Sequence, residues 1–157
     1  MKILMLTLGS RGDVQPYVAL GRGLQQAGHA VRLATAEPFA EFVTSNGLEF
    51  VPLTGKFLDV MQTSEGKAAF AGKANALELL REMKPMMRQM MDDGWQAAAG
   101  VDAVIYHPKP LSGYSIAEKL DVPAILAVPL PLYSPTRAFP SPILPFASLG
   151  GALNRAS

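Results

Sequence analysis

The chain has 157 residues, with 14 Lys and Arg against 13 Asp and Glu, so its formal net charge is +1. This length fits one domain that buries its own core, and a content of 49% hydrophobic and 17% charged residues excludes a disordered chain. The near-neutral charge disfavours nucleic acid as a partner, while zero cysteines and 2 histidines exclude a disulfide framework and a Cys-rich or His-rich metal site.

The first third of the chain predicts alternating strands and helices. A continuous apolar run before Gly9 is typical of a strand that is buried on both faces of a parallel sheet. Gly28 follows a stretch of helical apolar spacing and predicts a helix end. We expect strands over 3–8, 31–35 and 49–52, and helices over 14–27 and 38–45. This β-α-β-α-β order predicts the mononucleotide-binding half of a doubly wound, Rossmann-like α/β/α fold with a mostly parallel sheet.

The alternation continues in the rest of the chain. Residues 56–73 predict a loop with one short helix, and six prolines between 129 and 145 predict an extended surface loop. We expect helices over 75–99 and 112–120, and strands over 101–106 and 123–128. Residues 148–157 resemble the start of a further helix that is cut short. We therefore interpret residues 1–157 as one Rossmann-like domain of a longer protein.

The strand order predicts where a ligand binds. In an open parallel sheet, ligands bind beyond the carboxyl ends of the strands, at the point where the strand order reverses. If the first three strands lie in the order 3-2-1, the fourth strand packs on the other side of the first. The crevice then lies between residues 9–13 and 106–112, so Asp13 and His107 come to one opening.

The loop after the first strand has the sequence GSRGD over residues 9–13. Gly9 and Gly12 allow backbone amides to approach a ligand closely, at a helix N-terminus that favours anions. The alternative is an ordinary tight strand-to-helix turn, because the loop matches neither a dinucleotide fingerprint nor a P-loop. Arg11 is a candidate for holding a phosphate or carboxylate, with a solvated loop cation as its alternative.

Asp13 has two compatible interpretations. As a helix N-cap, its carboxylate would accept a hydrogen bond from the amide of Gln15 or Tyr17. As a general base, it would remove a proton from a bound hydroxyl. A helix N-terminus keeps a carboxylate ionised, so Asp13 would be a weak base unless it is desolvated.

Three further features each allow a structural and a functional interpretation. His107 follows a strand and precedes a proline, so it is either a structural histidine or part of the site. Methionines at spacings of three and four predict core packing of the long helix, or else a plastic lining for an apolar ligand. They are Met83, Met86, Met87, Met90 and Met91. The flanking cations form a solvated face or, alternatively, a membrane-surface helix; they are Arg81, Lys84 and Arg88.

Residues 9–21, with the sequence GSRGDVQPYVALG, resemble the opening motif of a known enzyme family. This family is the GT-B glycosyltransferases of the sterol glucosyltransferase and glycopeptide-antibiotic glycosyltransferase group, with a family 28 N-terminal domain. The segment AGHAVRLAT at 27–35 is similar to their second strand, and HPK at 107–109 with IAEKLDVP at 116–123 to a later strand-helix-strand unit. The resemblance runs from Met1 to about Pro145.

The resemblance implies two Rossmann-like domains that face a cleft, with the acceptor bound by the N-terminal domain and the nucleotide sugar by the C-terminal one. It implies inversion at the anomeric carbon without a metal ion, and a nucleotide sugar as co-substrate in place of a cofactor. The Asp of the G-S/T-R-G-D motif, here Asp13, is the base in this family. Substrate-binding positions are then expected at Gly9, Ser10, Arg11 and Gly12, and at Met87 and Tyr133 in the methionine-rich helix and the loop 129–146 that would shape the acceptor pocket. The resemblance gives His107 no firm role, and we expect it as a binding position from its place at the opening.

The sequence therefore predicts the acceptor-binding half of a hexosyltransferase. The expected acceptor is an apolar alcohol or phenol such as a sterol, lipid or natural-product aglycone, and the expected donor is a UDP- or dTDP-hexose. The family's His/Gly-rich donor motif is missing from the chain, so the chain alone is expected to be inactive. The alternatives are a non-catalytic acceptor-binding or anchoring subunit that needs a separate donor-binding chain, and a flavodoxin-like nucleotide or flavin binder.

The sequence shows no targeting pattern. Its start has no small-residue cleavage site, and its longest apolar stretch, 122–133, is interrupted by prolines and falls short of the ~20 residues that cross a bilayer. We expect a cytoplasmic protein, with peripheral contact to a membrane as an option.

Overall fold

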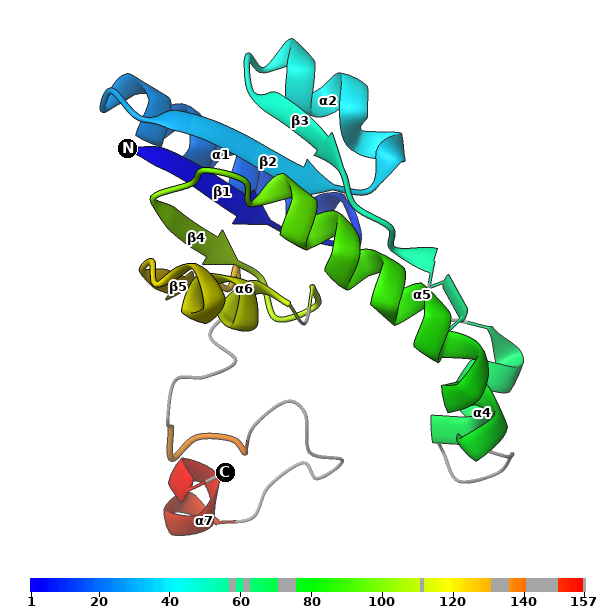
Figure 1. Ribbon diagram of the computed structural model, residues 1–157. Coiled ribbons are helices and arrows are strands. Elements are labelled where there is room, and N and C mark those ends of the chain that lie inside the picture. The colour runs from blue at the N-terminus through cyan, green and yellow to red at the C-terminus, as the bar shows by residue number, and fades with distance from the viewer. Residues whose placement is uncertain are drawn as a thin grey trace. The chain divides into compact units, whose positions relative to one another are not determined.

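The computed structural model describes residues 1–56, 59–60, 63–70, 76–110, 112–130, 136–140 and 150–156. The chain divides into two compact units, Met1–Ala127 and Val128–Ser157. The first unit contains the sheet of Figure 1. In the second, the described residues include one short helix, α7 (Gly151–Ala156), in which Asn154 donates a side-chain hydrogen bond to the carbonyl of Arg137.

The first unit alternates strands and helices, as the sequence predicts. Its strands are β1 (Lys2–Leu6), β2 (Ala30–Thr35), β3 (Glu49–Pro52), β4 (Ala103–Tyr106) and β5 (Ala124–Leu126). Its described helices are α1 (Arg11–Gln26), η1 (Glu37–Phe39, a 3-10 helix), α2 (Ala40–Ser45), α4 (Ser64–Phe70), α5 (Ala76–Ala97) and α6 (Gly113–Leu120). The main differences from the prediction lie at element ends, above all at the start of α1.

The five strands form one sheet in the order β3-β2-β1-β4-β5, and every neighbouring pair is parallel. In the register of the central strand, Leu4 lies between Arg32 of β2 and Val104 of β4. The predicted fold class and strand order are therefore confirmed. The reversal of strand order falls between β1 and β4, where the sequence places the crevice.

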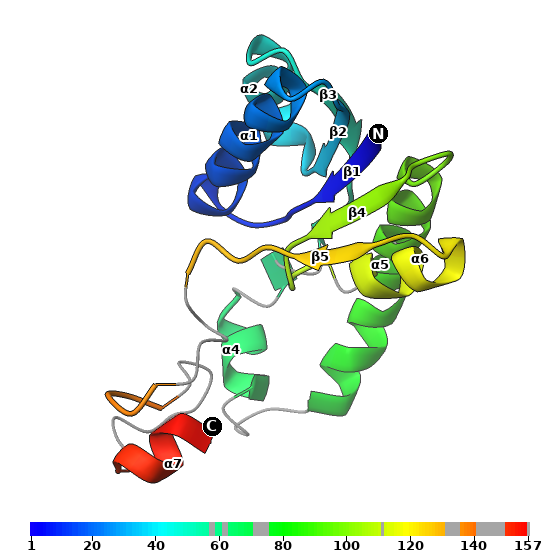
Figure 2. The same ribbon diagram turned by 90° about the vertical axis from the view of Figure 1, so that its left-hand side faces the viewer.

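Helices cover both faces of the sheet (Figure 2). Along β1, Ile3 and Met5 pack in the cluster formed with α1 and α2, whereas Leu4 and Leu6 pack in the cluster formed with α5 and α6. Because both faces are covered, the strand is apolar without alternation, which explains its continuous hydrophobic run.

The methionines of α5 chiefly serve the core. Met83 and Met90 are buried, and Met86 and Met87 are half-buried against the same cluster. The prediction of core packing is confirmed for these four side chains. It is wrong for Met91, which is 46% exposed, because this residue lies on the outer side of the helix.

The remaining loops and ends agree only in part with the sequence. The predicted short helix within 56–73 is present as α4, and the described residues 136–140 of the predicted proline-rich loop contain neither helix nor strand. Across the described residues, the search for a helix long and apolar enough to span a membrane finds none. The cytoplasmic location expected from the sequence stays a prediction.

Candidate functional site

The carboxyl ends of β1 and β4 bring two short segments together. Residues 9–13 follow β1, and residues 107–109 follow β4, its neighbour in the sheet. His107 Nε2 lies 3.6 Å from Asp13 Oδ1, although the two residues are far apart in the sequence. The prediction that Asp13 and His107 share one opening is confirmed.

The start of α1 corrects the prediction that Asp13 is the helix N-cap. The helix begins at Arg11, so Ser10 is the N-cap and Asp13 is the third helical residue. The Asp13 carboxylate does not bond to the amide of Gln15 or Tyr17; instead, Oδ2 accepts hydrogen bonds from the amide of Ser10 at 2.8 Å and from its hydroxyl at 3.1 Å. The bond from the Ser10 amide to a carboxylate three residues on is that of a capping box, a pattern that the sequence analysis did not recognise.

Lys109 completes the surroundings of Asp13. Its Nζ lies 2.7 Å from Asp13 Oδ2, and its side chain is 40% exposed against 16% for Asp13. Lys109 belongs to the HPK segment that resembles the family, but the sequence alone predicts no role for it. The available signal was its position three residues beyond the end of a strand that neighbours β1, which puts a long cation within reach of the loop at 9–13.

Several opposing effects set the acidity of Asp13. Burial by itself raises the pKa of the carboxyl group. Hydrogen bonds from Lys109 and from the Ser10 amide, the positive charge of Lys109 and the Ser10 hydroxyl together outweigh burial and lower the pKa below its ordinary value of 3.8. Asp13 is therefore a carboxylate at neutral pH.

His107 is held in a defined orientation. It is 5% exposed, and its Nδ1 accepts a hydrogen bond from the backbone amide of Lys109 at 3.2 Å. In the neutral ring the proton then resides on Nε2, the atom that faces Asp13. Burial lowers the pKa of His107, and Lys109 acts in the same direction, against the opposing effect of Asp13. Tyr17 lies edge-on to the imidazole with 6.3 Å between ring centroids.

The two glycines of the loop have different roles. Gly9 has φ +132°, and a Cβ at this position would overlap the carboxylate of Asp13 and approach Lys109 Nζ within 2.6 Å. Gly12 lies in α1, and a Cβ there would meet nothing closer than the Ser10 hydroxyl at 3.6 Å. Of these two positions, only residue 9 must be glycine to avoid a clash with Asp13 and Lys109.

A cavity of about 600 Å³ adjoins this cluster, with Gly9 and Ser10 in its wall. Apolar side chains from the ends of β1, β2 and β3 form much of its lining, namely Leu8, Ala36, Pro38, Phe39, Pro52 and Leu53. The polar side chains around it include Glu37, Lys56 and Asp59. A concave, mostly apolar site with a few polar groups suits a small organic ligand.

The other expected site residues lie apart from this cluster or outside the described residues. The Arg11 guanidinium stacks over the Phe42 ring at 5.1 Å, and its Nε donates to the side chain of Gln15 at 3.1 Å. Met87 packs on α5 against the core. Tyr133 lies outside the described residues. Among the side chains that are described, no three His, Asp or Glu residues gather as ligands of a metal ion.

Comparisons with known proteins agree on one family. Residues 3–139 match the model of the glycosyltransferase family 28 N-terminal domain. The chain is 38% identical to a sterol 3-beta-glucosyltransferase of Glomerella lagenarium, over 98% of this chain and 10% of that protein. It is also 38% identical to the Gibberella zeae sterol 3-beta-glucosyltransferase, over 98% and 11% of the two chains. The chain thus spans about a tenth of the length of the curated relatives it matches.

Solved structures show the same fold. The glycosyltransferase SsfS6 of Streptomyces sp. SF2575, in complex with thymidine diphosphate, superimposes with a TM-score of 0.60 at 27% identity, over 80% of this chain and 38% of that one. The calicheamicin glycosyltransferase CalG4 gives a TM-score of 0.63 at 23% identity, over 80% and 31% of the two chains. At 23% identity, the match to CalG4 supports the fold alone.

Proposed function

The chain belongs to the glycosyltransferase family 28 N-terminal domains, and from this premise we propose that it supplies the acceptor-binding half of a sterol glucosyltransferase-like enzyme. The enzyme would move a hexose from a UDP- or dTDP-hexose to the hydroxyl of a sterol-like or other apolar acceptor. The observation that carries the proposal is the Asp13 carboxylate, which is held in place beside an apolar cavity at the carboxyl edge of the sheet.

The cavity supports an apolar acceptor. Its lining is rich in Leu, Pro and Phe side chains, and its volume of about 600 Å³ lies within the range of small-molecule sites. Two relatives that are 38% identical over nearly the whole chain carry sterol 3-beta-glucosyltransferase names. A rigid, mostly hydrocarbon alcohol would bury its body in this cavity and present its hydroxyl to Gly9, Ser10 and Asp13.

Asp13 would then act as the general base. As the acceptor hydroxyl approaches the anomeric carbon, its proton passes to the carboxylate, its oxygen bonds to that carbon, and the bond from the carbon to the nucleotide diphosphate breaks. Attack opposite the leaving group inverts the configuration. General-base assistance of this kind contributes typically ~10²–10⁴-fold to the rate. This chemistry needs no cofactor, and the family resemblance implies that it needs no metal ion.

The donor phosphates would be stabilised at the start of α1, where backbone amides and the helix dipole favour anions. Gly12 is the expected contact. Ser10 and Arg11 are weaker candidates, because the amide and hydroxyl of Ser10 already donate to Asp13 and the Arg11 guanidinium is engaged with Phe42 and Gln15. The remaining donor contacts would come from a nucleotide-sugar-binding domain, which the family resemblance implies as the second half of the enzyme.

One experiment tests the division of labour. The chain alone and the chain joined to the remainder of a curated relative are each assayed with UDP-glucose and a sterol, and sterol binding to the chain alone is measured by fluorescence. We expect sterol binding by the chain, transfer by the joined protein, and no transfer by the chain. Transfer by the chain alone, or the absence of sterol binding, would contradict the proposal. Sterol binding without transfer by any joined protein would favour the non-catalytic subunit.

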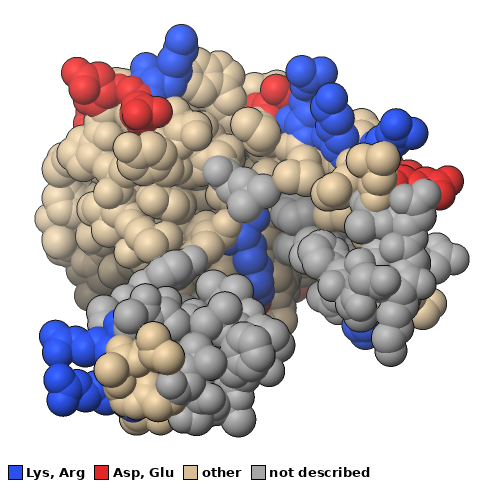
Figure 3. All heavy atoms as spheres, turned by 90° about the horizontal axis from the view of Figure 1, so that it is seen from below, with Lys and Arg blue, Asp and Glu red and all other residues tan. Residues whose placement is uncertain are grey.

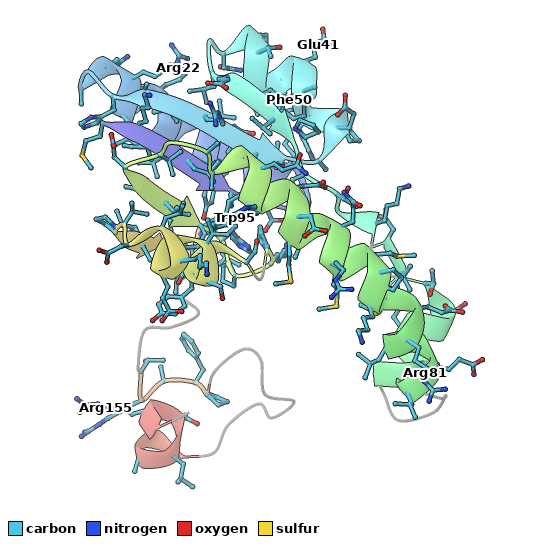
Figure 4. All side chains as sticks on the ribbon, viewed as in Figure 1. Arg22, Glu41, Phe50, Arg81, Trp95 and Arg155 are labelled. Atoms are coloured by element: carbon cyan, nitrogen blue, oxygen red, sulfur yellow. The ribbon has the colours of Figure 1, made fainter. Side chains whose placement is uncertain are left out.

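We also propose that α5 makes peripheral contact with a membrane. Its outer side carries a stripe at spacings of three and four residues, which we call the α5 stripe: Leu77, Leu80, Arg81, Lys84, Arg88, Met91 and Trp95. The apolar members are exposed, from 46% for Met91 and Trp95 to 61% for Leu77. Figure 4 shows Arg81 and Trp95 at opposite ends of α5. The combination of cations with Leu and Trp on one side of a helix suits the surface of an anionic bilayer.

A further inference from the structure

The two carboxylate oxygens of Asp13 have different surroundings. Oδ2 accepts from the amide of Ser10 at 2.8 Å and from its hydroxyl at 3.1 Å, and it faces Lys109 Nζ at 2.7 Å. Oδ1 faces His107 Nε2 at 3.6 Å, which is longer than a hydrogen bond. A carboxylate oxygen has about two lone-pair sites, so Oδ2 is fully occupied, whereas Oδ1 keeps lone-pair capacity for a further donor.

Lys109 stabilises this difference between the two carboxylate oxygens. Its backbone amide donates to His107 Nδ1, so the main chain at residue 109 is tied to the imidazole that faces Asp13. The space that its side chain crosses exists because residue 9 is glycine, since a Cβ there would lie 2.6 Å from Lys109 Nζ. The ammonium group therefore reaches Oδ2 through space that Gly9 leaves open.

We propose that Lys109 is a positioning residue that anchors Asp13 through Oδ2, so that Oδ1 is the oxygen that receives the proton of the acceptor hydroxyl. This inference rests on the proposed function and specifies the geometry of its proton transfer. Lys109 itself touches neither the proton nor the sugar. Its exposed fraction of 40% leaves it hydrated, which suits a fixed partner for the carboxylate more than a buried acid or base.

The anchor has opposite effects on orientation and on basicity. The positive charge holds the carboxylate in one rotamer, and it also stabilises the ionised form. Removing it should make Asp13 a stronger base that points in less defined directions. A misplacement of about 1 Å at a reacting group can cost about 100-fold in rate. A variant without the charge should therefore lose turnover while its base becomes easier to protonate, a combination that a simple packing defect does not produce.

The groups that face Asp13 are few enough to separate. From β4 and the segment after it come His107 and Lys109, from the start of α1 the amide and hydroxyl of Ser10, and from within α1 the phenol of Tyr17. Burial and the charge of Asp13 both raise the pKa of Tyr17, so it is neutral at any pH that matters here. The remaining ionisable side chains that face Asp13, among the described residues, are His107 and Lys109.

The experiment is a carboxyl carbon NMR titration of Asp13 in this chain, with wild type, Lys109→Met, Lys109→Arg and the control Lys56→Met. Lys56 lies in the lining of the cavity at the same edge of the sheet but makes no contact with Asp13. We expect Lys109→Met to move the Asp13 titration to higher pH. Lys109→Arg should keep it low, and Lys56→Met should leave it in place. An unchanged titration in Lys109→Met would overturn the proposal, as would an equal shift in Lys56→Met.

A kinetic comparison completes the test in the joined protein. Lys109→Met should lower kcat by roughly 10- to 100-fold with little change in KM and move the acidic limb of the pH–rate profile upward, whereas Lys109→Arg should restore much of the rate. Full activity of Lys109→Met would overturn the positioning role. Because the titration requires no sugar transfer, failure of the inference and failure of the proposed function give different results.

Discussion

The strand-end cluster around Asp13 and the α5 stripe use charge in opposite ways. At the strand ends, Lys109 and Asp13 face each other at 2.7 Å, and Asp13 is mostly buried. On α5, the cations Arg81, Lys84 and Arg88 are exposed, and exposed apolar side chains precede and follow them along the helix. The space-filling view in Figure 3 shows exposed Lys and Arg side chains, in blue, on the surface of the described residues.

The two arrangements of charge allow different functions. Charges in a half-buried cluster interact at short range, so they fix the direction of a side chain and alter its pKa. Charges on an exposed helix act through water, so they attract an oppositely charged surface at a strength that falls with added salt. Substitutions in the Asp13 cluster should therefore change the stability of the fold and the rate of sugar transfer. Substitutions in the α5 stripe should change only the binding to a membrane.

The largest expected effect comes from filling the space that the Asp13 cluster uses. Gly9→Ala should lower the free energy of unfolding by roughly 2–4 kcal/mol, because it combines an unfavourable φ of +132° with overlap against Asp13 and Lys109. Gly28→Ala is the matched control, since φ is +86° there but nothing lies within 4 Å of the added Cβ. It should cost about 1 kcal/mol. Denaturant unfolding measures the free energy of unfolding of both variants. Equal losses would mean that overlap with Asp13 and Lys109 does not contribute to the cost of Gly9→Ala.

The α5 stripe should show an effect that is smaller for each residue and that depends on salt. Trp95 is the single tryptophan of the chain, so its fluorescence should shift to shorter wavelength on phosphatidylserine-containing vesicles and not on phosphatidylcholine alone. Exchange of Arg81, Lys84 and Arg88 for Gln should weaken binding roughly fivefold per cation, since each contributes about 1 kcal/mol near such a surface.

A matched triple variant controls for net charge. Gln at Lys2, Arg22 and Arg155, which are exposed elsewhere, should leave vesicle binding nearly unchanged. Equal losses in the two triple variants would show that overall charge governs binding and that the stripe has no special role.

Asp13 should also make stability depend on acidity. Its pKa is lowered in the folded state, so the unfolded chain binds the proton more tightly, and the contribution of Asp13 is present above the unfolded pKa and lost as pH falls through the folded one. The free energy of unfolding of the wild-type chain should fall as the pH drops below about 4. The free energy of unfolding of Asp13→Asn should fall less steeply over the same range. Asp59→Asn, the same change at an exposed side chain, is the control. Parallel curves for wild type and Asp13→Asn would contradict the pairing with Lys109.

The smallest effect should come from the second glycine of the loop. Gly12→Ala meets only the Ser10 hydroxyl at 3.6 Å and lies in α1, so stability should stay level or rise by up to about 1 kcal/mol. Thermal unfolding beside Gly9→Ala would show whether the two glycines differ as the geometry requires. A large loss at Gly12 would mean that the loop tolerates no side chain at all.

Sequence reasoning reached the architecture because the signals are strong and local. A continuous apolar run such as residues 3–8 has few interpretations, and strand order then follows from the rules for parallel sheets. The meeting of Asp13 and His107 follows from that order alone, without knowledge of any side-chain conformation.

The details of the site depend on geometry that spacing does not encode. The start of α1 at Arg11 depends on Ser10 as N-cap, which competes with Asp13 for the same role in the sequence. The contact of Lys109 with Asp13 depends on the path of a flexible side chain after a turn, and on room left by Gly9. The exposure of Met91 was missed because the predicted methionine stripe is wider than the buried side of α5.

The most direct test of the account is the rate of sugar transfer by the joined protein with Asp13→Asn, measured beside wild type and corrected for the folded fraction. Asparagine keeps the size of the side chain and removes its ability to take a proton. We expect a loss of roughly 10²–10⁴-fold in kcat with sterol binding retained. A rate near that of wild type would show that Asp13 only caps α1, and the proposal that it is the general base would be wrong.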